Sequence, residues 1–378
     1  HKQIVKKLIF IVENFFIKRD FDRFEIQFFI NNKIDVEVWD ITEFCSKNFH
    51  KLVKPKNEII GNYIKKLKSS QDIKNAFKNL KGESLFAVFL NLNISTFLVF
   101  RLLSKYKISY FINSGASIFL YPKWLKRNLS KKIIAFFDKD RRSMMEYFQN
   151  MFLRIFPLKL LGISDVPIYF KDCKAADMAI SLKKKLIGKN TKIILSHHRD
   201  YDLYLKYKNN NDEKYKSGAV LIDQNAGYHN DLIRIGAFLD PEKWYKPFEN
   251  FFDLLKNKYS IKTTISAHPR SNGEINSFFP AYPIIKNKTP QLIKNCSFVI
   301  CQTSTAINFA VLFKKPMIFV YNPNIPMENK GANIIKEQEV IYAASHFNKK
   351  PINIGNLDNF NLENELKINE NSYNRFID

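Results

Sequence analysis

The sequence predicts an α/β protein with two Rossmann-like domains facing a central cleft. Short apolar runs, typical of buried parallel strands, alternate with segments of helical periodicity in both halves of the chain. A polar, charge-rich stretch at 207–217 (YKNNNDEKYKS) separates the halves. The chain of 378 residues is long enough for two domains of roughly 150–200 residues each. We therefore expect an N-terminal domain at 1–206 and a C-terminal domain at 217–378.

The N-terminal domain opens with a strand, a helix and a second strand, which together form a βαβ unit. These elements are expected, in that order, at 6–13, 19–30 and 35–41. One further helix is expected at 95–104, and further strands are expected at 85–90, 108–112, 176–180 and 191–196. The C-terminal domain has the same alternation without a sequence repeat. Its strands are expected at 219–222, 262–266, 298–301 and 316–321, and its helices at 241–258, 290–294 and 306–313.

The segment 123–159 differs in character from its surroundings. It holds ten Lys and Arg against three Asp and Glu, interleaved with aromatic residues and methionines. An amphipathic stretch of this kind can lie on a membrane surface. A helical hairpin whose aromatic side chains belong to the core would produce the same pattern. Both interpretations of this insertion in the N-terminal domain stay open.

The chain carries a net charge of +24, from 60 Lys and Arg against 36 Asp and Glu. Two explanations of this charge stay open. It can attract the protein to an anionic membrane surface, or it can reflect a Lys- and Asn-rich composition without functional meaning. Nucleic acid is disfavoured as a partner because no nucleic-acid-binding module is recognisable. The four cysteines lack the spacing of metal ligands, and the sequence shows neither a signal-peptide pattern nor a long apolar run. We therefore expect a cytoplasmic protein, peripheral on the inner membrane face if the basic segment binds lipid.

A first polar cluster follows the first strand of the C-terminal domain, at 223–231 (DQNAGYHND). Asp223, His229 and Asp231 place two carboxylates and an imidazole at a strand's carboxyl end, where open α/β sheets bind ligands. Such groups can supply a general base, a general acid or an orienting partner. A turn-capping aspartate and an ordinary loop histidine would give the same pattern.

Two more clusters follow later strands. In the first, His268 is fixed by Pro269, so that it can donate a hydrogen bond to a phosphate, and Arg270 can add a bidentate contact. The second cluster precedes a predicted helix and offers consecutive polar side chains that suit a phosphate or carboxylate, with one more a turn later. Its members are Gln302, Thr303, Ser304, Thr305 and Asn308. The alternative for His268 is a solvated histidine at the rim of the sheet, and the alternative for the second cluster is an ordinary helix cap.

The N-terminal domain also carries polar side chains at or near the ends of predicted strands. We expect them on the acceptor side of the cleft, although the arginines can equally be surface charges of a helix. They are Glu13, Arg19, Arg23, Ser114, His198 and Asp200. The chain lacks a Walker lysine loop, a G-x-G-x-x-G motif, an H-E-x-x-H motif, a C-x-x-C pair and a G-x-S-x-G elbow. Nucleotide hydrolysis, dinucleotide redox chemistry, zinc catalysis and serine nucleophile chemistry are therefore disfavoured.

Three motifs, taken in order, resemble those of bacterial surface-carbohydrate biosynthesis proteins, namely capsule and lipooligosaccharide glycosyltransferases of the GT-B fold. They are D-Q-x(4)-H-x-D, A-H-P-R-S and T-S-T-A-I-N-F-A-V-L-F-K-K-P, and the opening E-N-F-F-I-K-R-D-F-D-R-F is similar as well. The resemblance spans both domains and is densest from Asp223 to Tyr321. Bacterial GT-B sialyltransferases carry an acidic motif, an HP motif and a Ser/Thr pair in the same order.

The resemblance implies a role for each matching residue. Asp223 or Asp231 would be the catalytic base, His268 would support the donor phosphate, and Ser304 with Thr305 would hold the phosphate or carboxylate of the donor. The acid pair followed by Gly that sialyltransferases carry is absent from this sequence. The identity of the base and of the donor therefore stays open.

The expected function is an inverting, metal-independent glycosyltransferase. It would move an acidic keto-sugar, of the sialic, pseudaminic, legionaminic or Kdo kind, from a CMP donor to a glycan or lipid-linked acceptor of the cell surface. Transfer from a UDP- or GDP-sugar, or epimerisation of such a sugar on the same fold, is the alternative enzyme function. A basic membrane- or polysaccharide-binding scaffold is the alternative without catalysis.

Overall fold

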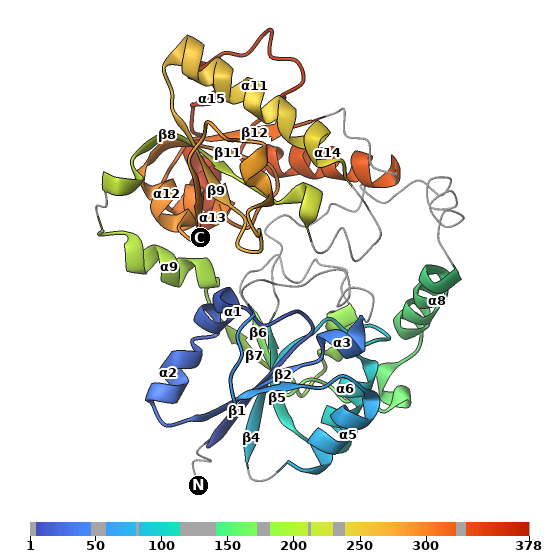
Figure 1. Ribbon diagram of the computed structural model, residues 1–378. Helices are drawn as coiled ribbons and strands as arrows, with labels where there is room; N and C mark the ends of the chain where they lie inside the picture. The colour runs from blue at the N-terminus through green and yellow to red at the C-terminus, as the bar shows by residue number, and fades with distance from the viewer. Residues whose placement is uncertain are drawn as a thin grey trace. The chain divides into compact units, whose positions relative to one another are not determined.

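The computed structural model describes residues 5–46, 58–80, 83–113, 141–171, 182–210, 213–229, 239–322 and 330–377. The described chain forms two compact units, the first ending at His197 and the second beginning at His198 (Figure 1). Of the residues and segments singled out above, Ser114, Asp231, 123–140 and the expected strand at 176–180 lie outside the described residues. Each unit is described by itself.

The first unit is built on a seven-stranded sheet in the order β3-β2-β1-β4-β5-β6-β7, with every neighbouring pair parallel. Its strands are β1 (Lys7–Val12), β2 (Asp35–Asp40), β3 (Ile64–Lys66), β4 (Ser84–Phe89), β5 (Ser109–Asn113), β6 (Ile168–Lys171) and β7 (Lys192–Leu195). Its helices are α1 (Lys18–Arg23), α2 (Ile26–Asn31), α3 (Thr42–Cys45), α5 (Ser70–Lys78), α6 (Phe97–Lys105) and α8 (Arg141–Ile155).

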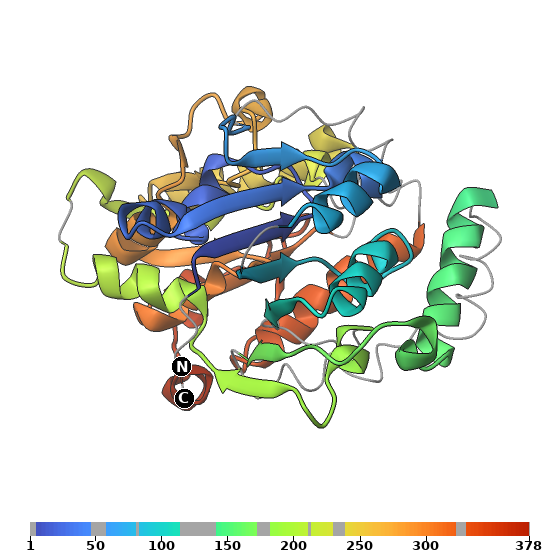
Figure 2. The same cartoon turned by 90° about the horizontal axis from the view of Figure 1, so that it is seen from below.

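The central strand β1 explains why this sheet is covered on both faces. Its side chains alternate between two cores: Ile9 and Ile11 pack in one, and Leu8 and Phe10 pack in the other. Alternation with a period of two residues is what a pleated strand imposes, and a strand buried on both faces is apolar throughout. β1 lies between β2 and β4. Figure 2 shows β1 and β2 as neighbouring strands at the blue end of the colour scale.

One helix differs from the prediction. A single helix was expected at 19–30, but the structure has two short helices, α1 and α2, separated at Glu25. Glu25 has a left-handed backbone conformation, with φ of 52°, which a helix interior does not accommodate. The apolar periodicity continues through this break, so the pattern alone could not reveal it.

The second unit has a six-stranded parallel sheet in the order β10-β9-β8-β11-β12-β13. Its strands are β8 (Ser217–Ile222), β9 (Thr263–Ala267), β10 (Ile284–Lys286), β11 (Cys296–Cys301), β12 (Met317–Tyr321) and β13 (Ile352–Asn353). Its helices are α9 (Arg199–Tyr207), α11 (Pro241–Tyr259), α12 (Thr289–Asn295), α13 (Ile307–Leu312), α14 (Lys330–Ser345), α15 (Leu362–Glu365) and α16 (Glu370–Ile377). The prediction of two Rossmann-like α/β domains is confirmed, whereas the cleft between them stays a prediction.

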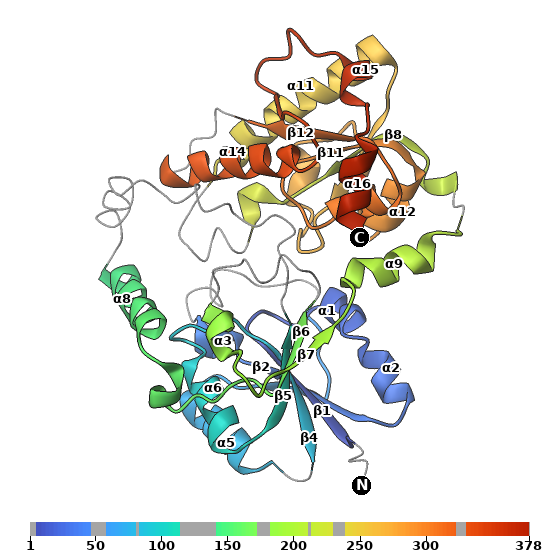
Figure 3. The same ribbon diagram turned by 180° about the vertical axis from the view of Figure 1, so that it is seen from behind.

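Helices cover both faces of the second sheet. On one face, Leu221 of β8 packs with Tyr245 and Phe248 of α11. On the other face, Val220 shares a core with Val340 of α14, a helix that Figure 3 shows together with α12 and α16. Burying each such side chain stabilises the fold by about 1.5–3 kcal/mol. α11 begins at a proline, and the preceding aspartate caps it by accepting hydrogen bonds from two backbone N–H groups.

The chain changes direction in the middle of this sheet. From β8 it continues outward to β9 and β10, and it then returns to the other side of β8 to form β11, β12 and β13. Loops that follow β8 and β11 therefore leave neighbouring strands at the same edge and turn to opposite faces. This is a topological switch point, the place where open α/β sheets bind ligands.

The border between the two units lies earlier than the predicted end of the first domain at 206. Residues 199–206 were assigned to the first domain, but α9, which contains them, belongs to the second unit. Tyr204 of α9 packs against Phe313 with ring centroids 5.1 Å apart, and Lys294 Nζ donates to the Tyr207 carbonyl at 3.1 Å. These contacts with distant parts of the second unit are tertiary, so the local pattern does not reveal them.

The described part of the insertion at 123–159 consists of α8 and the turn that follows it. Leu153 lies in the core of the first unit, while Phe152, Ile155 and Phe156 are exposed at 42%, 69% and 43%. Neither the core hairpin nor the membrane-surface interpretation is decided by these side chains. Among the described helices, none combines the length and the apolar character needed to cross a bilayer.

Candidate functional site

The polar residues that follow β8, β9 and β11 meet at the switch point of the second sheet. β8 ends before Asp223, β9 ends before His268 and β11 ends before Gln302. β8 pairs with both β9 and β11, so these three strand ends are neighbours along one edge. The sequence predicted ligand-binding groups at all three positions.

Asp223 is enclosed beneath α11. Its side chain is 5% exposed, and Oδ1 accepts a hydrogen bond from the Tyr245 hydroxyl at 3.3 Å. Oδ2 is buried without a hydrogen-bond partner in the described structure. Burial raises the pKa of Asp223 to about 6, although backbone N–H groups at Asn225, His268 and Gln224 act in the opposite direction. The carboxyl can therefore exchange a proton near neutral pH, but it faces Tyr245 and not solvent.

His229 and His268 lie side by side, one from the loop after β8 and one from the end of β9. Their ring centroids are 5.2 Å apart, with the rings inclined at 61°. Nδ1 of His268 accepts a hydrogen bond from the Arg270 N–H at 3.2 Å. In the neutral imidazole the proton must then reside on Nε2, which is left as the donating atom. The two candidates predicted from separate motifs thus form one pair.

The loop after His268 is held by its own polar groups. The Ser271 N–H donates to the His268 carbonyl at 2.9 Å, and Ser271 Oγ donates to Glu274 at 3.1 Å. Lys286 Nζ donates to the Ser271 carbonyl at 2.5 Å. Pro269 and Arg270 are both partly exposed within this turn. The His-Pro-Arg segment therefore sits in a braced loop, which limits the motion of His268.

The cluster after β11 divides into side chains with different roles. Gln224 Nε2 donates to Thr303 Oγ1 at 3.2 Å, which joins the loop after β8 to the loop after β11. Ser304 Oγ accepts from the Ala306 N–H at 3.2 Å and so stabilises the turn before α13. Thr305 is exposed. Because α13 has only six residues, its dipole adds little to anion binding, and the hydroxyls themselves carry the predicted role.

Asn308 contacts other protein groups, and its predicted role in donor binding stays a prediction. Its Nδ2 donates to Asp200 Oδ2 at 2.9 Å and lies 3.2 Å from His198 Nδ1. Asp200 is 4% exposed. His198 and Asp200 were expected on the acceptor side of the first domain, yet they join Asn308 within the second unit because α9 packs on α13. The three residues form a polar cluster, buried at Asp200 and Asn308 and partly exposed at His198, that anchors α9.

The described candidates of the first unit are engaged with other protein groups. Glu13 is 6% exposed, and its Oε1 accepts from the backbone N–H and the Nδ2 of Asn91 at 3.1 and 3.0 Å. Arg19 donates to Asp20 through Nε and Nη2 at 3.0 and 2.7 Å. Arg23 lies in the last turn of α1. An acceptor-binding role for these residues stays a prediction.

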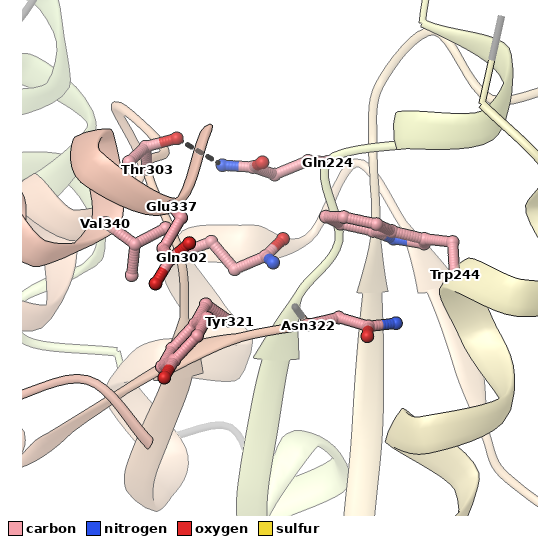
Figure 4. A pocket seen from close by; sticks show the side chains of 8 residues that line it. All are labelled: Gln224, Trp244, Gln302, Thr303, Tyr321, Asn322, Glu337 and Val340. Atoms are coloured by element: carbon pink, nitrogen blue, oxygen red, sulfur yellow. Dashed lines mark hydrogen bonds between the residues drawn. The ribbon is translucent and has the colours of Figure 1, made fainter. Parts of the chain in front are cut away.

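A pocket opens at the same edge of the second sheet, between the ends of β8, β11 and β12 and the helices α11 and α14 (Figure 4). It is a shallow depression that is open to solvent. Its polar side chains are Gln224, Gln302, Thr303, Asn322 and Glu337. Trp244, Tyr321 and Val340 complete the lining.

Sequence reasoning identified Gln302 and Thr303 of this pocket and missed the rest as site residues. Asn322 follows β12 directly, and the rule that singled out the other strand ends applies to it as well. Trp244 lies in the first turns of α11, and Glu337 lies on α14, where no local motif marks it. Among the described His, Cys, Asp and Glu residues, no group of three is arranged to hold a metal ion.

No family model matches the chain, and no curated protein matches it either. Several solved structures are similar in fold. The calicheamicin glycosyltransferase CalG4 shares 7% identity at a TM-score of 0.49, with 99% of this chain and 92% of that chain covered. The UDP-GlcNAc 2-epimerase from Methanocaldococcus jannaschii shares 14% identity at a TM-score of 0.43, with 98% of both chains covered.

A 2,6-sialyltransferase from Photobacterium sp. JT-ISH-224, in a complex with CMP and lactose, is also similar. It shares 11% identity at a TM-score of 0.42, with 84% of this chain and 72% of that chain covered. These likenesses are distant, and the function of this chain has to be argued from its own residues.

Proposed function

We propose that the protein is a nucleotide-sugar-dependent glycosyltransferase whose donor binds at the switch point of the second sheet. One observation carries this proposal. The His229–His268 pair lies at the same edge of the sheet as the pocket that the loops after β8 and β11 line. Such an edge combines groups that can transfer protons with groups that can hold a polar ligand. The leading version uses a CMP-activated acidic keto-sugar and a surface glycan or lipid-linked acceptor.

His268 would assist departure of the nucleotide. Its Nε2 carries the proton of the neutral imidazole, because Nδ1 accepts from the Arg270 N–H. A hydrogen bond from Nε2 to the phosphate would stabilise the negative charge that develops as the sugar–phosphate bond breaks. Arg270 would add a second, cationic donor, and Thr305 an exposed hydroxyl. Charge neutralisation of this kind needs no metal ion.

The acceptor hydroxyl has to lose a proton as it attacks the sugar in an inverting reaction. His229, Asp223 and Asp231 are the proposed candidates for the base. His229 lies beside His268. The group that accepts the proton and the group that donates a hydrogen bond to the phosphate would therefore occupy neighbouring positions. Asp223 would act only after a movement that exposes its carboxyl, since Tyr245 and the surrounding residues enclose it. The structure favours His229 over Asp223 for direct contact with substrate.

A peripheral position on an anionic membrane is part of the proposal. Support comes from the net charge of +24 and from the exposed apolar side chains of α8, with Phe152 at 42% and Ile155 at 69%. Exposed apolar side chains with nearby cations favour the membrane interface. Binding to vesicles with and without anionic lipid would test this part independently of catalysis.

Nucleotide titration tests the main proposal. CMP, UDP and GDP are titrated into the full chain by calorimetry, and the corresponding activated sugars are then offered with a glycan acceptor. Binding selective for CMP supports the leading version. Binding of UDP or GDP alone would replace the CMP donor by a UDP- or GDP-sugar, and an absence of binding by all three nucleotides would defeat the proposal.

A further inference from the structure

The turn that carries His268 is closed by its own backbone. His268, Pro269, Arg270 and Ser271 form a β-turn in which the Ser271 N–H donates to the His268 carbonyl at 2.9 Å. Pro269 occupies the second position of this turn, where its fixed φ is favourable. Within the turn, the Arg270 N–H donates to Nδ1 of the His268 ring at 3.2 Å. The direction of one backbone N–H therefore sets which ring nitrogen of His268 carries the proton.

His198 makes the same kind of bond in a different setting. Its Nδ1 accepts from the Asp200 N–H at 3.2 Å, and the chain continues directly into the nine residues of α9. The regular geometry of a helix therefore fixes the N–H that reaches the His198 ring. The turn at His268 is followed instead by the four-residue 3₁₀ helix Glu274–Ser277, which does not include Arg270. The restraint on the Arg270 N–H has to come from side chains.

Two oppositely charged side chains hold Ser271, the residue that closes the turn. Lys286 Nζ donates to the Ser271 carbonyl at 2.5 Å, and the Ser271 hydroxyl donates to Glu274 Oε2 at 3.1 Å. The same carboxylate oxygen accepts from the Asn272 N–H at 2.6 Å. Ser271 is 1% exposed, so its polar groups bond to the protein and not to solvent. Hydrogen bonds to charged groups are stronger than those between neutral groups, so Glu274 and Lys286 form a stiff brace.

Lys286 reaches this position from the neighbouring strand. It is the last residue of β10 and lies opposite Ala267, the residue before His268, in the parallel pairing of β10 with β9. Burial lowers the pKa of Lys286, and the charge of Glu274 acts in the opposite direction. Partial desolvation of a cation costs free energy, which the bond to the turn and the nearby carboxylate offset. The brace thus ties the turn that carries His268 to the sheet.

We propose that Glu274 and Lys286 are positioning residues for His268, which keep its ring in the tautomer with the proton on Nε2. They act through Ser271 on the Arg270 N–H. This role rests on the proposed function, in which Nε2 of His268 donates to the leaving phosphate. Without the brace the turn loses its fixed shape, Nδ1 loses its donor, and the proton divides between the two ring nitrogens. A fraction of the molecules then presents an acceptor to the phosphate in place of a donor.

Two independent measurements test the brace in the full chain. Nitrogen NMR of the histidine rings, at a pH where the imidazole is neutral, reports which nitrogen of His268 carries the proton. The His268 signal is assigned by its loss in His268→Gln. Steady-state transfer, with the donor identified by nucleotide titration, reports the turnover number and the KM separately. Both measurements are applied to Lys286→Met and Glu274→Ala. Lys286→Arg keeps the cation, and Lys288→Met changes an exposed lysine nearby as the matched control.

Lys286→Met and Glu274→Ala are each expected to convert the single Nε2–H form of His268 into a mixture of both tautomers. The turnover number should fall about tenfold while the KM for the donor stays within about twofold, because alignment is lost and binding is not. Lys286→Arg should restore the single tautomer and most of the turnover, and Lys288→Met should behave as wild type. A merely structural role would lower the unfolding midpoint without changing the tautomer in the folded protein.

This role is overturned if Lys286→Met and Glu274→Ala both keep the wild-type tautomer. A loss of turnover in that case would come from the fold or from direct contact with substrate. The role is also overturned if the tautomer changes and the turnover number does not, since the position of the proton would then have no bearing on transfer. A wild-type chain that neither binds nucleotide nor transfers sugar would defeat the proposed function, and the tautomer measurement would still decide whether the brace orients His268.

Discussion

The carboxyl edges of the two sheets are built from similar residues but differ in how their polar groups are satisfied. In the first unit, Glu13 accepts two hydrogen bonds from Asn91, and Asp40 accepts one from the Thr42 N–H at 2.8 Å. In the second unit, Asp223 Oδ2 is buried without a hydrogen-bond partner among the described residues. An acid or amide that follows a parallel strand is therefore not by itself a site. What marks the second edge is a buried carboxylate oxygen that is still unsatisfied, beside the His229–His268 pair.

The comparison has an energetic meaning. Polar groups that bond to one another at the first edge stabilise the fold by about 1 kcal/mol per hydrogen bond. The unsatisfied Oδ2 of Asp223 at the second edge costs stability in the free protein. Substitutions at the first edge should therefore change unfolding, and substitutions of the partly exposed groups at the second edge, such as His268, should change binding or transfer.

The largest expected effect is on transfer activity at the second edge. His268→Ala removes the proposed donor to the leaving phosphate, and we expect the turnover number to fall by about 100-fold or more. The measurement is steady-state transfer with the donor identified by nucleotide titration. His197→Ala, which changes an exposed histidine, is the control and should keep wild-type activity. Full activity of His268→Ala would remove this histidine from the mechanism.

The buried cluster at α9 should behave like the first edge, although it lies in the second unit. Asn308→Ala removes the donor that Asp200 Oδ2 and His198 Nδ1 share. We expect a loss of about 1–3 kcal/mol in the free energy of unfolding, because a buried carboxylate is left with one partner fewer. Urea unfolding measures this loss.

The nucleotide affinity of Asn308→Ala is measured under conditions in which the variant is folded. It should remain within about twofold of wild type, a difference of well under 1 kcal/mol, because Asn308 bonds to Asp200 and His198. A large loss of affinity with unchanged stability would return Asn308 to the donor-binding residues predicted from the sequence. Asp200→Asn is the matched partner variant. Because the two side chains contact each other, the double variant should lose less stability than the sum of the single variants.

Asp223 makes stability depend on pH. Its pKa is about 6 in the folded chain against an ordinary value of 3.8, so the folded state holds the proton more tightly than the unfolded state. Stability is therefore lost as pH rises from about 4 to about 6 and stays lower above that window. Asp223→Asn cannot ionise and avoids this loss. Its free energy of unfolding should rise relative to wild type by about 2 kcal/mol between about pH 4.5 and about pH 7.5.

Urea unfolding of both proteins at the two pH values checks this prediction. Tyr245→Phe is the control, because it removes the hydroxyl that donates to Oδ1 and keeps the ionisable carboxyl. That variant should keep the pH dependence. A constant difference between Asp223→Asn and wild type at the two pH values would show that the carboxyl is not the group responsible.

The strands that sequence analysis predicted most directly share one physical feature, namely a long, continuously apolar run of residues. β1, β8 and β11 are each six residues long and buried over most of their length, so their pattern is visible without tertiary information. The strands that were missed, β3, β6, β10 and β13, have two to four residues. Segments of that length rarely show a periodic pattern, although β7, which also has four residues, was predicted at 191–196.

The candidate site divides along a similar line. His229 and His268 could be predicted because each follows a strand directly, and the structure places the two rings together. The partners of Asn308 could not be predicted, because they come from α9 and the residue before it, about a hundred residues away in the chain. Glu337 could not be found at all, since its position in the pocket depends on how α14 packs on β12. Pairings of this kind are decided by packing and not by local sequence.

The smallest expected effect tests the first edge directly. Asn91→Ala removes the Nδ2 donor to Glu13 and keeps the backbone N–H that donates to the same oxygen. Because one of two hydrogen bonds is lost, we expect the free energy of unfolding to fall by about 1 kcal/mol. Nucleotide affinity should not change, since Asn91 and Glu13 satisfy each other. A loss of affinity at unchanged stability would mean that this edge also binds ligand, and satisfied polar groups would then no longer distinguish the two sheets.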